Sequence, residues 1–215
     1  PPPARPGAPY SPPPPPPPPG GGGGPAAPRR PPPGPPRPEA RRQAQASFDA
    51  LFGADDLSQV SRLERLAIGY WTALLTRSAA AGFYRELLAG QDEATAAALD
   101  AAGPAAITTG PYGDYPAGPL SAENTTGPHW IPDDRLSGEL GPRLAAALAH
   151  THLLVYRPRD SSAAALQRLV DAGWSATGIV TVSQLVSFLS FQLRLVAGLT
   201  VLRDHGAAPQ QGDQA

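Results

Sequence analysis

The feature that most constrains the fold is a long apolar segment near the C-terminus, residues 179–202. Its length raises the question of a membrane-spanning helix. Gln184, Gln192 and Arg194 lie within it, however, and each costs a few kcal/mol near the centre of a bilayer. A helix that is apolar around most of its circumference is buried in a core or in a subunit interface. We therefore predict a helix over residues 175–202 that other helices enclose, and no membrane partner.

Small polar residues form one narrow stripe on this predicted helix. Ser183, Ser187, Ser190 and Arg194 follow one another at intervals of four, three and four residues, so they share a face. Two interpretations stay open. The stripe is either a close helix contact with Arg194 reaching a carboxylate at its rim, which we favour, or a polar cleft in which Arg194 binds an anionic group.

Proline is distributed unevenly along the 215 residues. Of the 30 prolines, 21 lie in residues 1–38, next to the glycine run at residues 20–24. Such a segment has too few apolar side chains to offset the entropy of ordering its backbone. We predict a disordered tail over residues 1–38, one folded domain over residues 39–206 and a disordered C-terminus over residues 207–215.

Charge and cysteine content exclude several classes of function. The four arginines of the tail give it a charge of +4, and the other 13 arginines against 18 acidic residues give the remainder −5. A mildly acidic domain lacks the basic surface that nucleic acid requires. The absence of cysteine excludes disulfides and thiol chemistry. No acidic residues or histidines have metal-ligand spacing, so we expect neither a metal nor a cofactor, and we expect a cytoplasmic protein.

The remainder of the folded domain has helical rather than β periodicity, which predicts an all-α class. Ser61 and Glu64 fit a capping box, in which each residue caps a backbone N–H of the other. The predicted helices cover residues 39–52, 61–75, 78–89, 92–102, 142–156, 162–172 and 175–202.

A long segment, residues 103–141, lacks periodicity and is rich in Gly-Pro turns. Long loops inside compact domains are usually functional or disordered. Because this one carries Tyr112, Tyr115, His129 and Trp130, we expect it to pack as a lid or strap. His129 and Trp130 could close a cleft as gate and proton carrier, or Trp130 could simply fix the loop to the helices. The two tyrosines have the same two interpretations.

His150 and His152 lie two residues apart on a predicted helix, which places them about 200° apart around its axis. A helical metal pair requires a spacing of four residues. We expect one histidine to face inward and the other to face solvent. A structural role is the favoured interpretation, with a general base as the alternative.

Several elements of the C-terminal part follow one another in a specific order. An alanine-rich helix precedes Pro158–Asp160, a short helix ends in Ala172-Gly173-Trp174-Ser175, and the long helix carries Phe191-Gln192-Leu193-Arg194. This order resembles the carboxymuconolactone decarboxylase / alkylhydroperoxidase D superfamily. Residues 61–90 are similar to the family's glutamate-bearing helix and the helix after it. The segment at residues 110–121, GPYGDYPAGPLS, resembles an uncharacterised subgroup whose genes accompany a second alkylhydroperoxidase-like domain. The resemblance implies an alkylhydroperoxidase D-like bundle of about six to seven helices.

The sequence departs from this superfamily where its peroxidases carry Cys-x-x-Cys with a nearby glutamate and histidine. The corresponding residues 77–86 contain neither cysteine nor histidine. Thiol peroxidase chemistry is therefore unavailable to this chain alone. We predict a structural or partner subunit of a peroxidase-related oxidoreductase system, which forms a homo-oligomer through residues 179–202 or pairs with an alkylhydroperoxidase-like domain.

A small pocket for acid–base chemistry or anion binding remains a candidate site. An alternative function is an enzyme acting on a small carboxylated or lactone substrate. A third is an interaction protein whose proline-rich tail docks into aromatic grooves of a partner. The candidate catalytic residues are Glu64, His150 and His129, and the candidate substrate-binding residues are Arg194, Ser187, Ser190, Tyr112, Tyr115 and Trp130.

Overall fold

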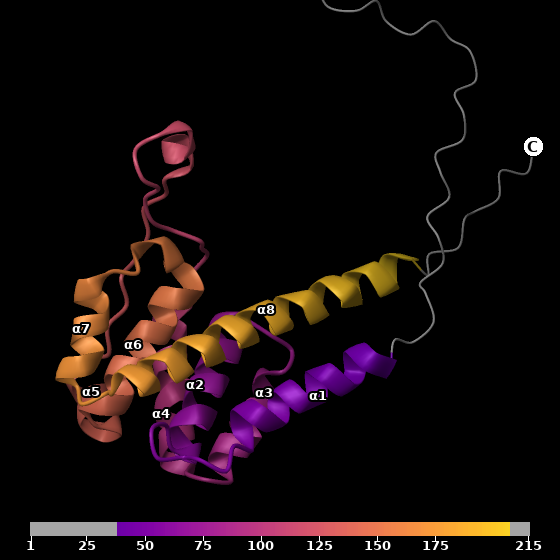
Figure 1. Ribbon diagram of the computed structural model, residues 1–215, viewed down its shortest axis with the longest axis vertical. Coiled ribbons are helices and arrows are strands. Elements are labelled where there is room, and N and C mark those ends of the chain that lie inside the picture. Colours follow the sequence, from indigo (N-terminus) through magenta and orange to yellow (C-terminus); the bar gives the residue numbers. More distant parts are fainter. Residues whose placement is uncertain (1–37, 207–215) are drawn as a thin grey trace, which may run out of the picture. The chain divides into compact units, whose positions relative to one another are not determined.

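The computed structural model describes residues 38–206 (Figure 1). Regular structure in this range consists of helices, with one isolated β-bridge between Gly113 and Thr125, so the predicted all-α class is confirmed. The predicted disordered tails lie essentially outside the described residues. The α-helices are α1 (Pro38–Phe52), α2 (Arg62–Leu75), α3 (Ala81–Ala89), α4 (Glu93–Ala106), α5 (Asp134–Leu140), α6 (Pro142–Tyr156), α7 (Ala163–Asp171) and α8 (Ala176–Gly206), and two short 3-10 helices are η1 (Pro119–Glu123) and η2 (Pro158–Asp160).

Helix α2 lies at the centre of the bundle and contacts α3, α4, α6 and α8. Ten of its 14 residues are buried. The predicted capping box sets its first turn: the Ser61 hydroxyl accepts the Glu64 N–H at 3.2 Å, and the Glu64 carboxylate accepts the Ser61 N–H at 2.8 Å. This local pair aligns the first turn of α2, and the buried apolar face then holds the helix among its neighbours.

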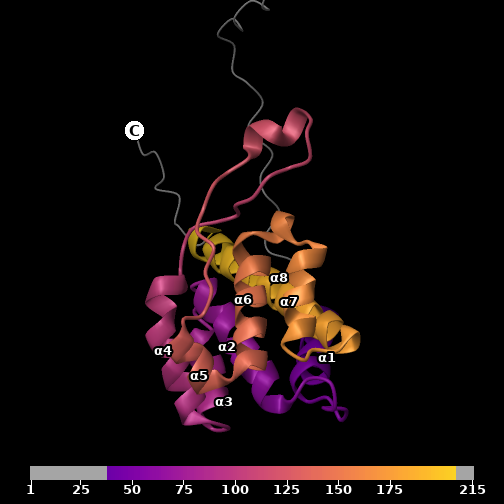
Figure 2. The same cartoon turned by 90° about the vertical axis from the view of Figure 1, so that its left-hand side faces the viewer.

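Helix α8 lies along α2 and α6 and then extends past them (Figures 1 and 2). Val182, Leu185 and Leu189 are fully buried, whereas every residue from Arg194 to Asp204 is exposed. The N-terminal half therefore buries one face against the bundle, while Val180, Gln184 and Ser187 stay exposed. Burial of this helix in a subunit interface remains a prediction. The prediction that other helices of the same chain enclose the whole helix is wrong. The reason is length: 31 residues span about 46 Å, while the 15 residues of α6 span about 22 Å. By length and composition, α8 is also the one helix in the described range that could cross a membrane.

Helix α4 continues through Gly103-Pro104, where the sequence predicts its end. Pro104 sits in the last turn, and the N–H of Ile107 still bonds to the carbonyl of Gly103 at 2.9 Å. Gly103 packs so closely on α2 that a Cβ there would lie 2.8 Å from a methyl group of Leu74. This contact between helices keeps the last turn helical despite the proline.

Helix α5 forms within the segment predicted to be irregular. The Asp133 carboxylate caps it by accepting the N–H of Leu136 at 2.7 Å, and the buried side chain of Leu136 anchors it. Gly141, with a φ of +77°, reverses the chain directly before α6. Seven residues are too few to give a helical periodicity that can be recognised in the sequence.

The segment between α4 and α5, residues 107–133, is called the strap. Its tip around η1 stands away from the helices in both views, and most tip residues are exposed (Figures 1 and 2). Its ends are fixed: the N–H of Tyr112 donates to the Tyr156 carbonyl at 2.6 Å, and the Arg157 guanidinium donates to the Gly127 carbonyl at 2.6 Å. The prediction of a packed lid therefore holds for the two ends of the strap only.

Candidate functional site

A cavity of about 340 Å³ lies between the end of the strap, α5, α6 and α7. This volume is at the small end of the range for ligand pockets. Alanine, leucine, proline and aromatic side chains make up most of its wall. The residues with polar groups are His129, Ser137, His150, His152, Arg157 and Arg168. We call it the histidine cavity, because it is lined by three of the four histidines of the sequence, namely His129 of the strap and His150 and His152 of α6.

His150 connects the wall of the histidine cavity to α8. Its Nε2 forms a hydrogen bond of 3.0 Å with the Ser183 hydroxyl, while its Nδ1 is buried without a partner among the described residues. Burial, and then the positive charge of Arg168, lower the pKa of His150 to about 4. At neutral pH this side chain is therefore an uncharged hydrogen-bonding group.

His152 is buried on another side of α6. Its Nε2 donates to the carbonyl of Ala106 at 3.0 Å, and its ring centroid lies 4.9 Å from that of Tyr156 and 5.7 Å from that of Trp130. Burial lowers the pKa of His152. The prediction that one histidine faces solvent is wrong, because α6 has neighbours on several sides and both side chains are at least 95% buried.

Trp130 forms the part of the wall that belongs to the strap. Its ring lies 4.9 Å from that of the fully buried Trp71 of α2, so it anchors the strap to the core. His129, directly before it, is exposed at the edge of the cavity. Of the two predicted interpretations, the geometry supports anchoring for Trp130 and leaves His129 as the one cavity histidine open to solvent.

Two arginines reach the histidine cavity and differ in their partners. Arg157 is buried and forms an ion pair with Asp160 at 2.6 Å. Arg168 is exposed and donates only to the carbonyl of Ala164, at 3.5 Å; it has no acidic partner within the described range. Its charge nevertheless acts on His150. Arg168 is therefore the cation of the cavity that is available to an anion.

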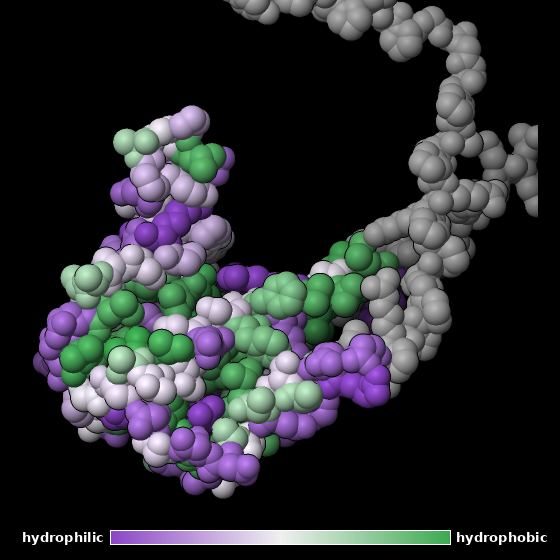
Figure 3. All heavy atoms as spheres, viewed as in Figure 1, coloured by the Kyte–Doolittle hydropathy of each residue, from purple (hydrophilic) through white to green (hydrophobic). Residues whose placement is uncertain are grey.

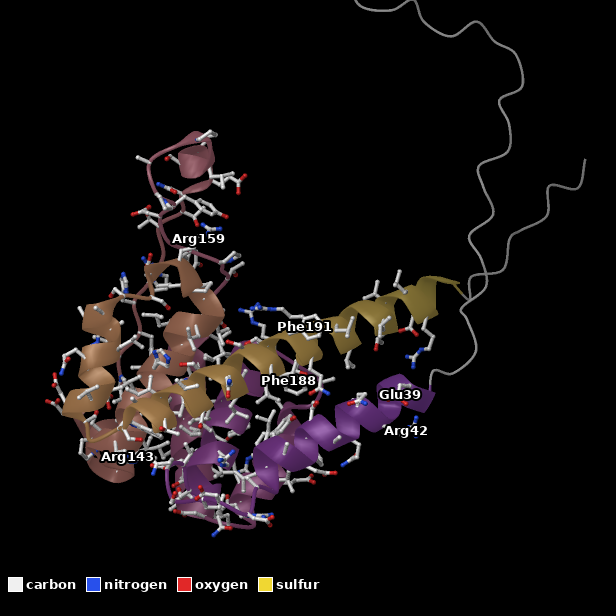
Figure 4. All side chains as sticks on the ribbon, in the orientation of Figure 1. Glu39, Arg42, Arg143, Arg159, Phe188 and Phe191 are labelled. Atoms are coloured by element: carbon white, nitrogen blue, oxygen red, sulfur yellow. The ribbon has the colours of Figure 1, made fainter. Side chains whose placement is uncertain are left out.

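Glu64, the predicted catalytic carboxylate, does not line the histidine cavity. Besides closing the capping box, it accepts a hydrogen bond from Arg143 Nε at 2.6 Å. Arg143, labelled in Figure 4, also donates to the carbonyls of Gly173 and Gln59. Its guanidinium stacks on the ring of Trp174 at 3.8 Å. This cluster joins the starts of α2, α6 and α8, which is a structural role.

The predicted polar stripe of α8 does not form a cleft. Ser187 is exposed, and Ser190 is buried with a hydroxyl that has no partner in the part of the chain that the structure describes. Arg194 is exposed and donates to the Val155 carbonyl at 3.3 Å rather than to a carboxylate. None of the three lines the histidine cavity, because the stripe passes from the bundle into the part of α8 beyond it.

Tyr112 and Tyr115 fix the strap and do not reach the histidine cavity. The Tyr112 hydroxyl lies 2.9 Å from that of Thr108. The ring of Tyr115 is covered at 4.0 Å by the guanidinium of Arg159, a residue labelled in Figure 4. Both tyrosines thus stabilise the conformation of the loop, which is the simpler of the two predicted interpretations.

The residue that sequence reasoning missed is Arg168. It lies on a short amphipathic helix whose polar residues face outward by default, and no motif distinguishes it from a solvated arginine.

Across residues 38–206, no group of three or more histidine, cysteine or acidic side chains is arranged to hold a metal. No family model matches the chain, and no curated protein shows significant similarity to it.

Proposed function

We propose that this chain is a thiol-less member of the carboxymuconolactone decarboxylase / alkylhydroperoxidase D-like superfamily that binds a small organic anion in the histidine cavity. The observation that carries the proposal is the guanidinium of Arg168, which has no acidic partner among residues 38–206 and lies at the edge of a mainly apolar cavity. A guanidinium binds carboxylates strongly, and the apolar wall suits a hydrophobic or aromatic body. The ligand class is therefore a monocarboxylate with a compact apolar part.

The histidines support binding rather than proton transfer. A general base is most effective when its pKa lies near the working pH. The pKa of His150 is about 4 and that of His152 is also lowered, both mainly by burial. These two side chains therefore act as neutral hydrogen-bonding groups of the wall, which favours a ligand-binding domain over an acid–base enzyme.

Titration calorimetry with benzoate and benzamide tests this proposal. Both probes have one aromatic ring, and only benzoate is an anion. We expect benzoate to bind with a Kd on the order of 0.1–1 mM and benzamide to bind at least about tenfold more weakly. Arg168→Ala should abolish the difference. Arg135→Ala, which removes an exposed arginine of α5 paired with Glu139 at 2.7 Å, is the matched control.

Two outcomes contradict the proposal. One is benzoate binding that is unchanged in Arg168→Ala. The other is the absence of benzoate binding at a concentration of about 10 mM, which is well above the Kd expected for a probe of this size. The Arg135→Ala protein shows whether a loss reflects the position of the charge or only the net charge of the domain.

A structural or partner subunit is the second candidate function, and the exposed half of α8 favours it. Leu195, Leu199 and Leu202 on this half are between 46% and 55% exposed. Monomeric proteins rarely leave extended apolar patches open to water. Peroxidase chemistry through a thiolate remains unavailable, since the sequence contains no cysteine.

A further inference from the structure

The projecting half of α8 carries an ordered apolar stripe, which we call the outer stripe. Its members follow one another at intervals of three, four, four and three residues and thus share one helical face. Four of them are 46–66% exposed, and the first is half-buried where α8 leaves the bundle. The outer stripe consists of Phe188, Phe191, Leu195, Leu199 and Leu202. Its first two members, Phe188 and Phe191, are labelled in Figure 4.

The helical end of α8 has little to stabilise it within one chain. From Arg194 to Asp204 every residue is exposed. The segment includes Gly198, Thr200 and Val201, and glycine and β-branched residues are poor helix formers. Most of the stability of a helix comes from packing of its apolar face. A partner surface on the outer stripe accounts for a helix that continues this far.

We propose that a second copy of this chain covers the outer stripe, with the two α8 helices antiparallel around a two-fold axis at Leu195. The intervals of the stripe read the same in both directions from Leu195, so an antiparallel copy matches it member for member. Phe191 then faces the partner's Leu199, and Phe188 faces the partner's Leu202. The exposed C-terminal end of each α8 then packs on the part of the partner's α8 that contacts its own bundle.

The exposed area is consistent with this partner. The five partly exposed side chains of the outer stripe present an apolar patch on the order of 500 Å² (Figure 3). Two copies together would bury about 1,000 Å², which is the lower limit of specific interfaces. We therefore expect a dimer that forms at micromolar concentration.

A lipid bilayer fits this surface less well than a second copy does. The part of α8 from Phe191 onward has 16 residues and spans about 24 Å, which is less than the roughly 30 Å of a hydrocarbon core. It also carries Arg194, Arg203 and Asp204. The other half cannot enter a membrane unless Val182, Leu185 and the other core residues leave the bundle.

Light scattering of the full chain tests the dimer at about 50 µM, well above the expected Kd. We expect twice the 22.2 kDa mass of the chain for the unmodified protein and a single mass for Leu195→Glu. Val180→Glu is the matched control, because Val180 is 55% exposed on the bundled half of the same helix. That variant should remain dimeric. A monomeric unmodified chain, or a dimeric Leu195→Glu, overturns the proposal.

Cross-linking tests the orientation and does not depend on how Leu195→Glu folds. Since the chain has no cysteine, single-cysteine variants give unambiguous products with a short bismaleimide. Leu195→Cys should cross-link to itself. Phe191→Cys should cross-link with Leu199→Cys in a mixture and hardly at all with itself. Self-linking of Phe191→Cys as efficient as that of Leu195→Cys overturns the antiparallel arrangement.

Flotation with vesicles of phosphatidylcholine and phosphatidylglycerol decides between the two partners. The dimer should stay at the bottom of the gradient. If the chain is monomeric in solution and floats with the vesicles, while Leu195→Glu does not, the outer stripe is a lipid-binding surface and the dimer is excluded. The proposal is independent of the histidine cavity, so benzoate binding has no bearing on it.

Discussion

The two halves of α8 have similar apolar compositions and opposite surroundings. In the N-terminal half, Val182, Leu185, Val186 and Leu189 are fully buried against the bundle. From Arg194 onward the leucines and valines are between 46% and 56% exposed, and Figure 3 shows hydrophobic surface on this outer part of the helix. The comparison teaches that apolar composition predicts the need for burial but not the partner that provides it.

The largest expected effect comes from matched leucine truncations in the two halves. Leu189→Ala should lower the free energy of unfolding by about 2–5 kcal/mol, because it leaves a cavity in a packed core. Leu199→Ala, at a residue 55% exposed, should lower it by less than about 0.5 kcal/mol. Urea unfolding at concentrations where the chain is monomeric measures both values. Equal losses would mean that the two halves are packed alike.

The second effect concerns His150, which binds Ser183 on the buried half of α8. The pKa of His150 is 6.5 when unfolded and about 4 when folded, so the unfolded chain binds more protons between these values. Its contribution to stability is complete above pH 6.5 and is lost as the pH falls to 4, by up to about 3 kcal/mol. His150→Gln should flatten this part of the profile in urea unfolding. If stability falls between pH 6.5 and 4 as steeply in His150→Gln as in the unmodified chain, that would falsify the assignment of this loss to His150.

The third effect compares two glycines of α8. An added Cβ at Gly178 would lie 3.0 Å from the buried Trp174 ring and 3.3 Å from the Gln59 carbonyl, whereas at Gly198 it meets nothing within 4 Å. Gly198→Ala should raise the stability of the monomer by about 0.5–1 kcal/mol through helix propensity. Gly178→Ala should lower it by about 1 kcal/mol, because the contact outweighs that gain. Thermal unfolding should show a higher Tm for Gly198→Ala and a lower Tm for Gly178→Ala. Two Tm shifts of the same sign would contradict the difference in surroundings between the two glycines.

The smallest effect is expected at Ser190, where the two halves meet. Its hydroxyl is buried without a partner in the described structure. Ser190→Ala removes this unsatisfied group, so the free energy of unfolding should stay the same or rise by up to about 1 kcal/mol. Ser183→Ala, which removes the hydroxyl that binds His150, is the control and should be destabilising. A loss of more than about 1 kcal/mol in Ser190→Ala would show that the hydroxyl has a partner.

Local patterns predicted the helices well where the signal lies within a few residues. The capping box of Ser61 and Glu64 and the start of α6 at Pro142 depend on neighbours along the chain, and the structure has them as expected. Helix α7 begins one residue later than predicted, at Ala163, because Ser162 is its cap. Helix α5 was missed because one cap and the single buried Leu136 hold it. The end of α4 was placed too early, since its contact with Leu74 is invisible in the sequence.

The candidate site was predicted only in part. His129, Trp130 and His150 were singled out, and all three line the histidine cavity. Their grouping with Arg168, and the separation of Glu64 from them, depend on how α6 and α7 pack against the strap. Side-chain direction on a helix follows from the backbone, but the neighbour that a side chain meets is set by contacts between distant segments.

By itself, the sequence determined the helical class of the domain, its major helices and the lack of thiol chemistry, because periodicity, caps and cysteine content are local properties of the chain. Only the tertiary structure decided that α8 is half core and half surface. Burial depends on how far the neighbouring helices reach, and the last buried residue of α8 is Leu193, near the middle of the helix. The same packing decided that both α6 histidines are neutral and buried, since burial rather than residue type lowers their pKa values.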